Sequence, residues 1–319
     1  MVDLGASPVF VIPHHARSDE SWEYLERTVA SLFTQSDRDW RAVIVDDASP
    51  DPDVGRRLEA VRAGDPERLV VLRAETTGGP GAARNRGVSW AAARGAPFVL
   101  FLDADDLAHP HRLRRTRRVF AERPTVDFVY SGFTVIDEHG RPVPEERVTP
   151  SIREILDSHR EGPPEGPDAW IRIGTELGYT SLTSTVSTRI DLATRCPFPA
   201  THVAEDDHTW LRMSASGTGF AFLRDTEAGY RVPSTTAGSA TRAAVGAAFY
   251  WASAQVTADG FTRALATALA RGRVDEVEAA ALLSRFHDRL AETMAGEGCA
   301  DLAAVSRALA HCGGAVLPA

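Results

Sequence analysis

Three groups of acidic residues have the type and spacing that chemistry at a phosphate or sugar would need. They are Asp46–Asp47, the run Asp103–Asp106 and Glu205–Asp207. Carboxylates packed this densely repel one another unless a cation or hydrogen-bond donors compensate them. Because hard divalent cations prefer oxygen ligands, the run at 103–106 predicts bound Mg²⁺ or Mn²⁺ with open positions for a diphosphate. The alternative is that these acids cap a helix beginning near Leu107, which would account for only one of them.

Short apolar runs must position these acids. In the first half of the chain they alternate with amphipathic stretches, which predicts an α/β fold with a mostly parallel sheet flanked by helices. The expected strands are Val9–Ile12, Arg41–Val45, Leu69–Leu72 and the wholly apolar, central Phe98–Leu102; the expected helices are Glu23–Thr34 with Ser21 as cap, Val54–Ala63, Gly81–Ala93 and Leu113–Phe120. Two acidic groups directly follow strands, at the sheet edge where ligands of such folds bind.

The second half of the chain has a different sequence pattern. We expect a strand at Asp127–Ile136, a mobile loop or insertion at Arg141–Asp168, a β-branched strand at Thr180–Thr188 and a helix starting near Glu205. Beyond about Thr241 the sequence is Ala-rich with apolar stripes, which predicts two or three appended helices. The chain is therefore divided into a first domain, residues 1–240, and a C-terminal helical region, residues 241–319.

The composition excludes several classes of function. All 35 basic residues are Arg, so Schiff-base chemistry, pyridoxal phosphate and a Walker lysine are ruled out. The net charge of −9 argues against nucleic acid as the main partner. Cys196, Cys299 and Cys312 lack the close spacing of zinc or redox sites and are expected to be reduced thiols. No run is long enough for a signal or spanning helix, which predicts a soluble cytoplasmic protein without a membrane span.

Five motifs in order resemble those of family 2 glycosyltransferases, which have the GT-A fold. They are Val9–Pro13, Val45–Ser49, Gly81–Asn85, Leu102–Asp106 and Glu205–Arg212, and the resemblance covers about residues 8 to 233. It implies that the sugar-nucleotide donor is bound by Pro13, Asp47, Arg84, Asp103 and Asp105. Asp47 would hydrogen-bond the nucleobase beside the backbone near Pro13, and Arg84 would lie near the base or the diphosphate.

The resemblance also assigns the metal and the base. In the DXD-type motif, Asp105 would contact ribose, Asp106 would coordinate Mg²⁺ or Mn²⁺ with Asp105 beside it, and Asp103 would be auxiliary. Asp206 would be the catalytic base of a single displacement that inverts the anomeric centre. An acceptor hydroxyl is a poor nucleophile at neutral pH, so a carboxylate within hydrogen-bond reach must accept its proton. We expect UDP as the donor nucleotide, with dTDP next.

Further residues are candidates for acceptor binding or auxiliary roles: Glu205, Asp207, His208, Trp210 and Arg231. Trp210 could equally belong to the core, and Arg242 is the alternative to Arg231 as the cation that meets the leaving group. Trp170 and Tyr179 fall in the region that binds acceptor in the family. The sequence departs from the family pattern at His14–His15, and His15 is expected to line the pocket rather than bind metal.

The expected partners are a nucleoside-diphosphate sugar and a soluble acceptor such as a natural product or saccharide, with a homodimer through the C-terminal helices as a further prediction. Two alternatives remain open. One is a catalytically silent sugar-nucleotide-binding protein. The other is a haloacid-dehalogenase-type phosphatase, against which the missing lysine argues. A nucleotidyltransferase would carry basic residues after its first strand, where this chain has His14–His15.

Overall fold

A seven-stranded sheet organises the computed structural model, which describes residues 7–233 and 245–312. The strand order is β3-β2-β1-β4-β6-β5-β7, and among these strands β6 alone runs opposite to the others. The strands are β1 (Val9–His14), β2 (Arg41–Asp46), β3 (Leu69–Arg73), β4 (Phe98–Phe101), β5 (Phe128–Ile136), β6 (Ser187–Arg189) and β7 (Phe220–Arg231). The predicted mixed, mostly parallel sheet is confirmed.

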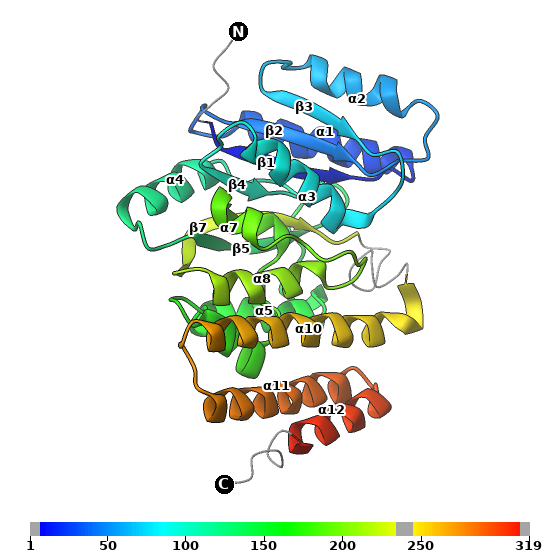
Figure 1. Cartoon of the computed structure of the whole chain (residues 1–319). Coiled ribbons are helices and arrows are strands. Elements are labelled where there is room, and N and C mark those ends of the chain that lie inside the picture. The colour runs from blue at the N-terminus through cyan, green and yellow to red at the C-terminus, as the bar shows by residue number, and fades with distance from the viewer. Residues whose placement is uncertain (1–6, 234–244, 313–319) are drawn as a thin grey trace.

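Helices cover both faces of this sheet (Figure 1). They are α1 (Asp19–Phe33), α2 (Val54–Ala63), α3 (Gly79–Ala92), α4 (Arg112–Glu122), α5 (Pro150–Glu161), α6 (Ala169–Arg172), α7 (Ile190–Arg195), α8 (Glu205–Ser216), α10 (Phe249–Ala270), α11 (Glu276–Gly296) and α12 (Ala300–Cys312). Single turns η1 (Glu145–Arg147), η2 (Ile173–Leu177), η3 (Thr183–Thr185) and η4 (Gly246–Ala248) link them.

The acidic groups meet because the strand order reverses around β1. The chain places β2 on one side of β1 and β4 on the other, all parallel. Asp47 directly follows β2 and Asp103 lies just beyond β4, so both lie at the same edge of the sheet. Every residue of β4 is buried, as its unbroken apolar sequence predicts for a central strand. A crevice at this switch point is where open α/β sheets bind ligands.

Alternation along each strand builds a core on either face of the sheet. Val9 and Val11 of β1 point into the cluster that also holds Phe128 and Trp210, whereas Phe10 on the same strand points into the opposite cluster. Successive side chains of a strand face opposite sides, so a fully apolar strand contributes to both clusters. Packing on both faces of the sheet fixes the positions of the strand ends that carry the acids.

Three sequence expectations are wrong in detail, and the first two concern α1 and α5. Ser18, not Ser21, caps α1, and its hydroxyl accepts from the Ser21 backbone N–H. The segment 141–168 is not an irregular loop: it contains α5, whose Ile152 and Ile155 pack on the apolar cluster beside β5. Proline suits the first turn of a helix, and Pro150 opens α5, which explains why a Pro-rich stretch could still be helical.

The predicted strand at 180–188 shrinks to β6. Its earlier residues form η3, in which the Thr185 hydroxyl donates to the carbonyl of Leu182. Hydroxyl side chains that bond the local backbone compete with strand pairing, which overrides their β-branched preference. This irregular segment leaves Tyr179 and Thr183 free to turn toward α8.

The C-terminal region is helical, as predicted, and consists of α10, α11 and α12. Phe261 of α10 and Phe286 of α11 stack on each other and belong to the same core cluster as Trp210. The division proposed at residue 240 lies outside the described residues, and the segments on either side of it share one core. Cys196 and Cys299 are free thiols. In the described part of the chain, no helix has the length and apolarity needed to cross a membrane.

Candidate active site

The carboxylate of Asp47 fastens the Gly-rich loop that leads into α3. Its Oδ1 accepts from the backbone N–H of Gly78 at 2.8 Å, and its Oδ2 accepts from Thr77 Oγ1 at 2.7 Å and from the N–H of Gly79 at 2.8 Å. A carboxylate offers about four acceptor positions, so one on Oδ1 stays available to a ligand. Asp47 therefore shapes the loop at the predicted nucleobase site and keeps one acceptor direction for the base.

His15 and Pro13 lie on the strand side of Asp47. Pro13 is buried within β1, opposite Val45 of β2. His15 Nδ1 lies 2.8 Å from the Asp47 carbonyl oxygen, to which it donates. This contact ties the His15 ring to the backbone that follows β2. Burial lowers the pKa of neighbouring His14 to about 4, so that imidazole is neutral.

A cavity of about 540 Å³ opens beside Asp47. It is lined by Ala48, Ser49, Arg73, Ala74 and Glu75, which follow or end strands β2 and β3. Its volume falls in the range of small-molecule pockets. Ala48 adopts the left-handed backbone conformation, with φ of 54°, where the chain turns away from Asp47. Strained residues of this kind concentrate at ligand sites, which agrees with the position of this cavity.

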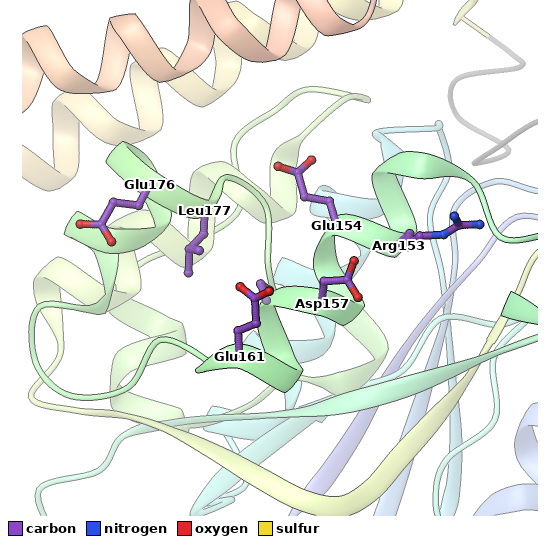
Figure 2. Close-up of a pocket in the computed structure, with 7 residues that line it drawn as sticks. Arg153, Glu154, Asp157, Glu161, Glu176 and Leu177 are labelled. Atoms are coloured by element: carbon purple, nitrogen blue, oxygen red, sulfur yellow. The ribbon is translucent and has the colours of Figure 1, made fainter. Parts of the chain in front are cut away.

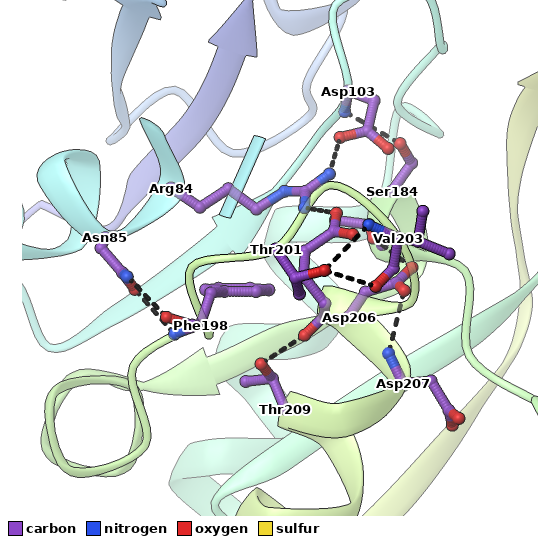
Figure 3. A network of polar contacts seen from close by, with 12 residues as sticks. Arg84, Asn85, Asp103, Ser184, Phe198, Thr201, Val203, Asp206, Asp207 and Thr209 are labelled. Atoms are coloured by element: carbon purple, nitrogen blue, oxygen red, sulfur yellow. Dashed lines mark hydrogen bonds and ion pairs between the residues drawn. The ribbon is translucent and has the colours of Figure 1, made fainter. Parts of the chain in front are cut away.

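Arg84 joins two acidic groups that are far apart in the sequence (Figure 3). From α3, its Nη1 donates to Glu205 Oε1 and its Nη2 donates to Asp103 Oδ1, both at 2.7 Å. The Arg84 side chain is only 4% exposed and Glu205 is 9% exposed. Burial lowers the pKa of Arg84, but the two carboxylates outweigh burial and the net direction is upward. Arg84 is therefore a permanent cation that holds the Asp103–Asp106 run against the first turn of α8.

The acids of the run at 103–106 differ in their exposure and in their hydrogen bonds. Asp106 is 1% exposed, and its Oδ1 accepts from the Arg231 backbone N–H at 2.8 Å. Asp105 is half-buried, and within the described residues no side-chain hydrogen bond ties its carboxylate to another residue. Burial and the charge of Asp103 raise the pKa of Asp105 to about 6, and burial and the neighbouring carboxylates raise that of Asp106 well above its usual value. Of the two predicted metal ligands, Asp105 has the free oxygens.

These carboxylates fit a divalent cation that also binds a diphosphate. The described residues contain no group of three or more His, Cys, Asp or Glu side chains arranged around a common point. Mg²⁺ is commonly held by one or two carboxylates together with substrate phosphates, so a preformed protein cage is not required. Burial and the charge of Asp103 both disfavour an ionised Asp105, and a bound cation would favour the ionised form. The donor set is therefore suitable for Mg²⁺ or Mn²⁺.

Asp206 lies half-buried at the start of α8, next to Asp207 (Figure 3). Three donors hold its carboxylate. Its Oδ2 accepts from Tyr179 Oη at 2.5 Å and from Thr183 Oγ1 at 3.0 Å, and its Oδ1 accepts from the Asp207 backbone N–H at 2.9 Å. One acceptor direction on Oδ1 remains for a substrate proton. This is the geometry that a general base needs, fixed in orientation and still able to accept.

Asp207 and His208 face away from this crevice, toward α10. Asp207 Oδ2 accepts from Thr257 Oγ1 at 2.8 Å, and His208 Nε2 lies 2.9 Å from Asp259 Oδ2. Burial raises the pKa of Asp207 to about 7. Burial also lowers the pKa of His208. Both residues therefore contact the C-terminal region, whereas Glu205 and Asp206 contact Arg84 and Tyr179.

The tryptophans suggested as acceptor contacts belong to the core. Trp210 is 2% exposed, packs against Phe101 and Phe128, and donates from Nε1 to the Ser181 carbonyl. Trp170 is fully buried. For both residues the acceptor-stacking interpretation is wrong, because a sugar ring cannot reach a buried aromatic face. Of these aromatic candidates, Tyr179 alone contacts Asp206.

Arg231 braces the acidic run from the end of β7. Its Nε donates to the Asp105 carbonyl and its Nη1 donates to the Asp137 carbonyl. Its Nη2 is buried with no partner among the described residues. Arg231 therefore places a buried cation beside the backbone of Asp105. Arg242, the alternative cation, lies outside the described residues.

A second acidic cavity, of about 410 Å³, lies between α5 and η2 (Figure 2). Its acids are Glu154, Asp157, Glu161 and Glu176. Glu154 pairs with Arg289, Asp157 pairs with Arg160, and Glu176 pairs with Arg285. Sequence reasoning treated this segment as a loop and gave it no site. Arginines of α5 and α11 thus pair with three of its four acids.

Sequence reasoning missed Thr77, Thr183, Thr257 and Asp259. A threonine hydroxyl carries no sequence signal for a partner 23 or 50 residues away, as Thr183 and Thr257 have in Asp206 and Asp207. Thr77 could have been found, because it stands directly before Gly78 and Gly79, where a Gly-rich loop leads into α3.

The model of glycosyl transferase family 2 matches residues 9–180, which are more than half of the chain. Curated relatives match shorter stretches of the chain. The succinoglycan biosynthesis protein ExoW of Rhizobium meliloti is 37% identical over 103 residues, covering 32% of this chain and 30% of that protein. The putative teichuronic acid biosynthesis glycosyltransferase TuaG of Bacillus subtilis is 32% identical over 123 residues, covering 38% and 46%. The matches thus span less than half of either relative.

Solved structures resemble most of the chain. TarS of S. aureus superposes with a TM-score of 0.58 at 21% identity, covering 89% of this chain and 43% of that one. The mannosyltransferase PcManGT of Pyrobaculum calidifontis, in complex with GDP-Man and Mn²⁺, superposes with a TM-score of 0.53 at 18% identity, covering 94% and 86%. At such identities the likeness shows the fold, and it confirms the predicted GT-A-like architecture.

Proposed function

The chain belongs to glycosyl transferase family 2, and from this premise we propose that it is a metal-dependent, inverting glycosyltransferase. It would transfer a sugar from a nucleoside-diphosphate sugar to a hydroxyl or amine of a soluble acceptor such as a natural product or a saccharide. One observation carries the proposal. Arg84 pairs with Asp103 and Glu205 at once, which brings the acidic run after β4 and the first turn of α8 to one crevice.

The donor nucleotide is proposed to lie across the ends of β2, β1 and β4. Its base would enter the cavity lined by Ala48, Ser49 and Glu75 and hydrogen-bond the remaining acceptor position of Asp47. UDP is the nucleotide that we favour, with dTDP next. One TarS structure holds UDP-GlcNAc, which supports this choice of donor class, whereas PcManGT holds GDP-Man.

The diphosphate would lie between Asp105 and Arg231. We assign the main metal-ligand role to Asp105, because the carboxylate of Asp106 is buried against the Arg231 backbone. Asp106 and Asp103 would orient the run, and the Arg231 Nη2 would donate to an anionic oxygen. A bound divalent cation would supply Lewis-acid stabilisation of the leaving diphosphate.

Asp206 would remove the proton from the attacking acceptor hydroxyl. Tyr179 and Thr183 orient its carboxylate and leave one direction of Oδ1 open, so the proton can pass to that oxygen as the new glycosidic bond forms. A single displacement of this kind inverts the anomeric carbon and needs no covalent enzyme intermediate. General-base catalysis by a positioned carboxylate is worth about 10²–10⁴-fold in rate.

Ligand-induced thermal shifts would test the donor assignment. Purified protein is scanned with UDP, dTDP and GDP, each with and without Mn²⁺. We expect UDP with Mn²⁺ to raise the melting temperature most, and Asp105→Asn to lose most of the Mn²⁺-dependent part. No stabilisation by any of the three nucleotides under either condition would refute the donor proposal. Binding without transfer to any acceptor or to water would favour the catalytically silent alternative.

A further inference from the structure

The first turn of α8 divides its acidic residues between two neighbours. Glu205 and Asp206 face Arg84 and Tyr179 in the crevice. The next two residues, Asp207 and His208, turn to the opposite side and contact α10 of the C-terminal region. The turn that carries the proposed base is thus held from behind by a helix that begins at Phe249, beyond the stretch that matches the family model.

The contact between α8 and α10 is close and polar. Thr257 Oγ1 donates to Asp207 Oδ2 at 2.8 Å, and Asp259 Oδ2 accepts from His208 Nε2 at 2.9 Å. Gly260 permits this approach, because a Cβ built there would lie 2.7 Å from the Cα of His208. Asp207 is 8% exposed, so the Thr257 hydroxyl compensates a buried carboxyl group.

The start of α8 lacks a side-chain cap from its N-cap residue. Ala204, its N-cap residue, has a left-handed backbone with φ of 53° and makes no side-chain capping bond. A polar N-cap typically contributes about 1 kcal/mol to helix stability, and this helix forgoes it. Besides the bond from the Asp207 N–H to Asp206, the side-chain partners of the first turn come from other elements: Arg84 and Tyr179 on one side, and α10 on the other.

We propose that α10 is part of the catalytic unit, and that Thr257 and Asp259 are positioning residues which hold the first turn of α8 so that Asp206 keeps its place in the crevice. This inference rests on the proposed function, in which Asp206 is the base. It assigns a role in the reaction to a helical region that sequence reasoning treated as an appendage. Neither positioning residue touches the substrate; both act through α8.

The test compares Thr257→Val with Thr262→Val. Thr262 lies on the same helix, is exposed and bonds only the Ala258 carbonyl, so its variant controls for loss of a helical threonine hydroxyl. Four sugar nucleotides are compared by thermal shift: UDP-glucose, UDP-GlcNAc, dTDP-glucose and GDP-mannose. The one that gives the largest shift is the substrate, and the assay measures nucleotide released when the sugar is transferred to water. A small misplacement of a catalytic group can cost about 10²-fold in rate.

We expect Thr257→Val to lower kcat at least tenfold with KM for the donor within twofold, while Thr262→Val matches wild type. Thr257→Ser, which keeps the hydroxyl, should restore kcat. Asp259→Ala should also lower kcat without changing KM, but by a smaller factor. Its control is Arg263→Ala, because Arg263 is the exposed ion-pair partner of Asp259 and is paired with that residue rather than with α8. Asp259 is half exposed, so its variant remains informative if Thr257→Val does not fold.

Amide hydrogen exchange provides a readout that needs no turnover. Backbone amides of 205–209 should exchange faster in Thr257→Val than in wild type, whereas those of β4 should be unchanged. Equal kcat and equal exchange in Thr257→Val and Thr262→Val would overturn the inference. Absence of nucleotide binding by the wild type would instead overturn the proposed function, and the exchange data would still decide whether α10 holds α8.

Discussion

Two acidic regions of this molecule differ in how their charges are held. In the strand-end crevice, Glu205 is 9% exposed and shares the single cation Arg84 with Asp103. In the cavity between α5 and η2, the side chains of Glu154 and Asp157 are 58% and 49% exposed, and each has an arginine beside it. Charges that stay in water interact weakly, whereas buried charges depend on every partner.

The comparison shows that burial, rather than the number of acids, distinguishes the proposed site from the solvated cavity. The cavity between α5 and η2 has a volume of about 410 Å³, large enough for a small ligand, and four acids line it. Burial raises the pKa values of Asp105 and Asp207, and those side chains lie in or directly behind the crevice. Perturbed carboxylates of this kind cluster at functional sites, which is why we place the chemistry in the crevice.

Asp206→Asn should have the largest effect. The amide can still accept from Tyr179 and Thr183, but it cannot take a proton from an acceptor, so transfer should fall by about 10²–10⁴-fold. Nucleotide release measures transfer, and a UDP titration measures donor binding separately. UDP affinity should stay unchanged. Asp157→Asn in the second cavity is the matched control and should turn over normally. Normal turnover by Asp206→Asn would move the base to another residue.

Arg84→Met should cost about 3–5 kcal/mol of unfolding free energy, because it leaves buried carboxylates without their cation. Urea unfolding followed by circular dichroism measures the change. Arg160→Met is the control: its ion pairs with Glu145 and Asp157 are exposed, so about 0–1 kcal/mol is expected. Equal losses in both variants would contradict the distinction between the two regions.

Asp207→Asn should alter how stability depends on pH. Burial raises the pKa of Asp207 from 3.8 to about 7, so between these values the folded chain keeps a proton that the unfolded chain has released. This contribution to stability is fully present below about pH 4 and is lost as the pH rises to about 7. Relative to wild type, the variant should therefore gain stability between pH 4.5 and 7.5. Urea midpoints across that range measure the difference; parallel curves would show that Asp207 titrates normally.

Glu176→Gln in the second cavity should have the smallest effect. Its partners Arg172 and Arg285 are about half exposed, so unfolding free energy should change by less than about 1 kcal/mol. Nucleotide release should stay within twofold of wild type. A large loss of turnover, with stability retained, would show that this cavity takes part in the reaction and that exposure is a poor guide to function here.

The sequence located site residues where the pattern that marks them lies among neighbouring residues. Strand ends followed by acids located Asp47 and the run at 103–106, and the start of α8 was placed at Glu205. Residues 141–168 were misjudged because proline and glycine suggest a loop, whereas Ile152 and Ile155 gain burial on β5 as part of a helix. The partners of Asp206 and Asp207 could not be predicted, because a hydroxyl reaches a carboxylate only after distant segments have folded together.

By itself, the sequence determined the α/β alternation, the family and the acids at the ends of β2 and β4, since strand periodicity and motif order are properties of neighbouring residues. Tertiary structure alone decided which acids face the crevice. It buried Asp106 against Arg231, joined Asp103 to Glu205 through Arg84, and turned Asp207 toward α10. The physical reason is desolvation: a carboxylate's partners and pKa depend on what packs around it, and packing is settled across the whole sheet and its helices.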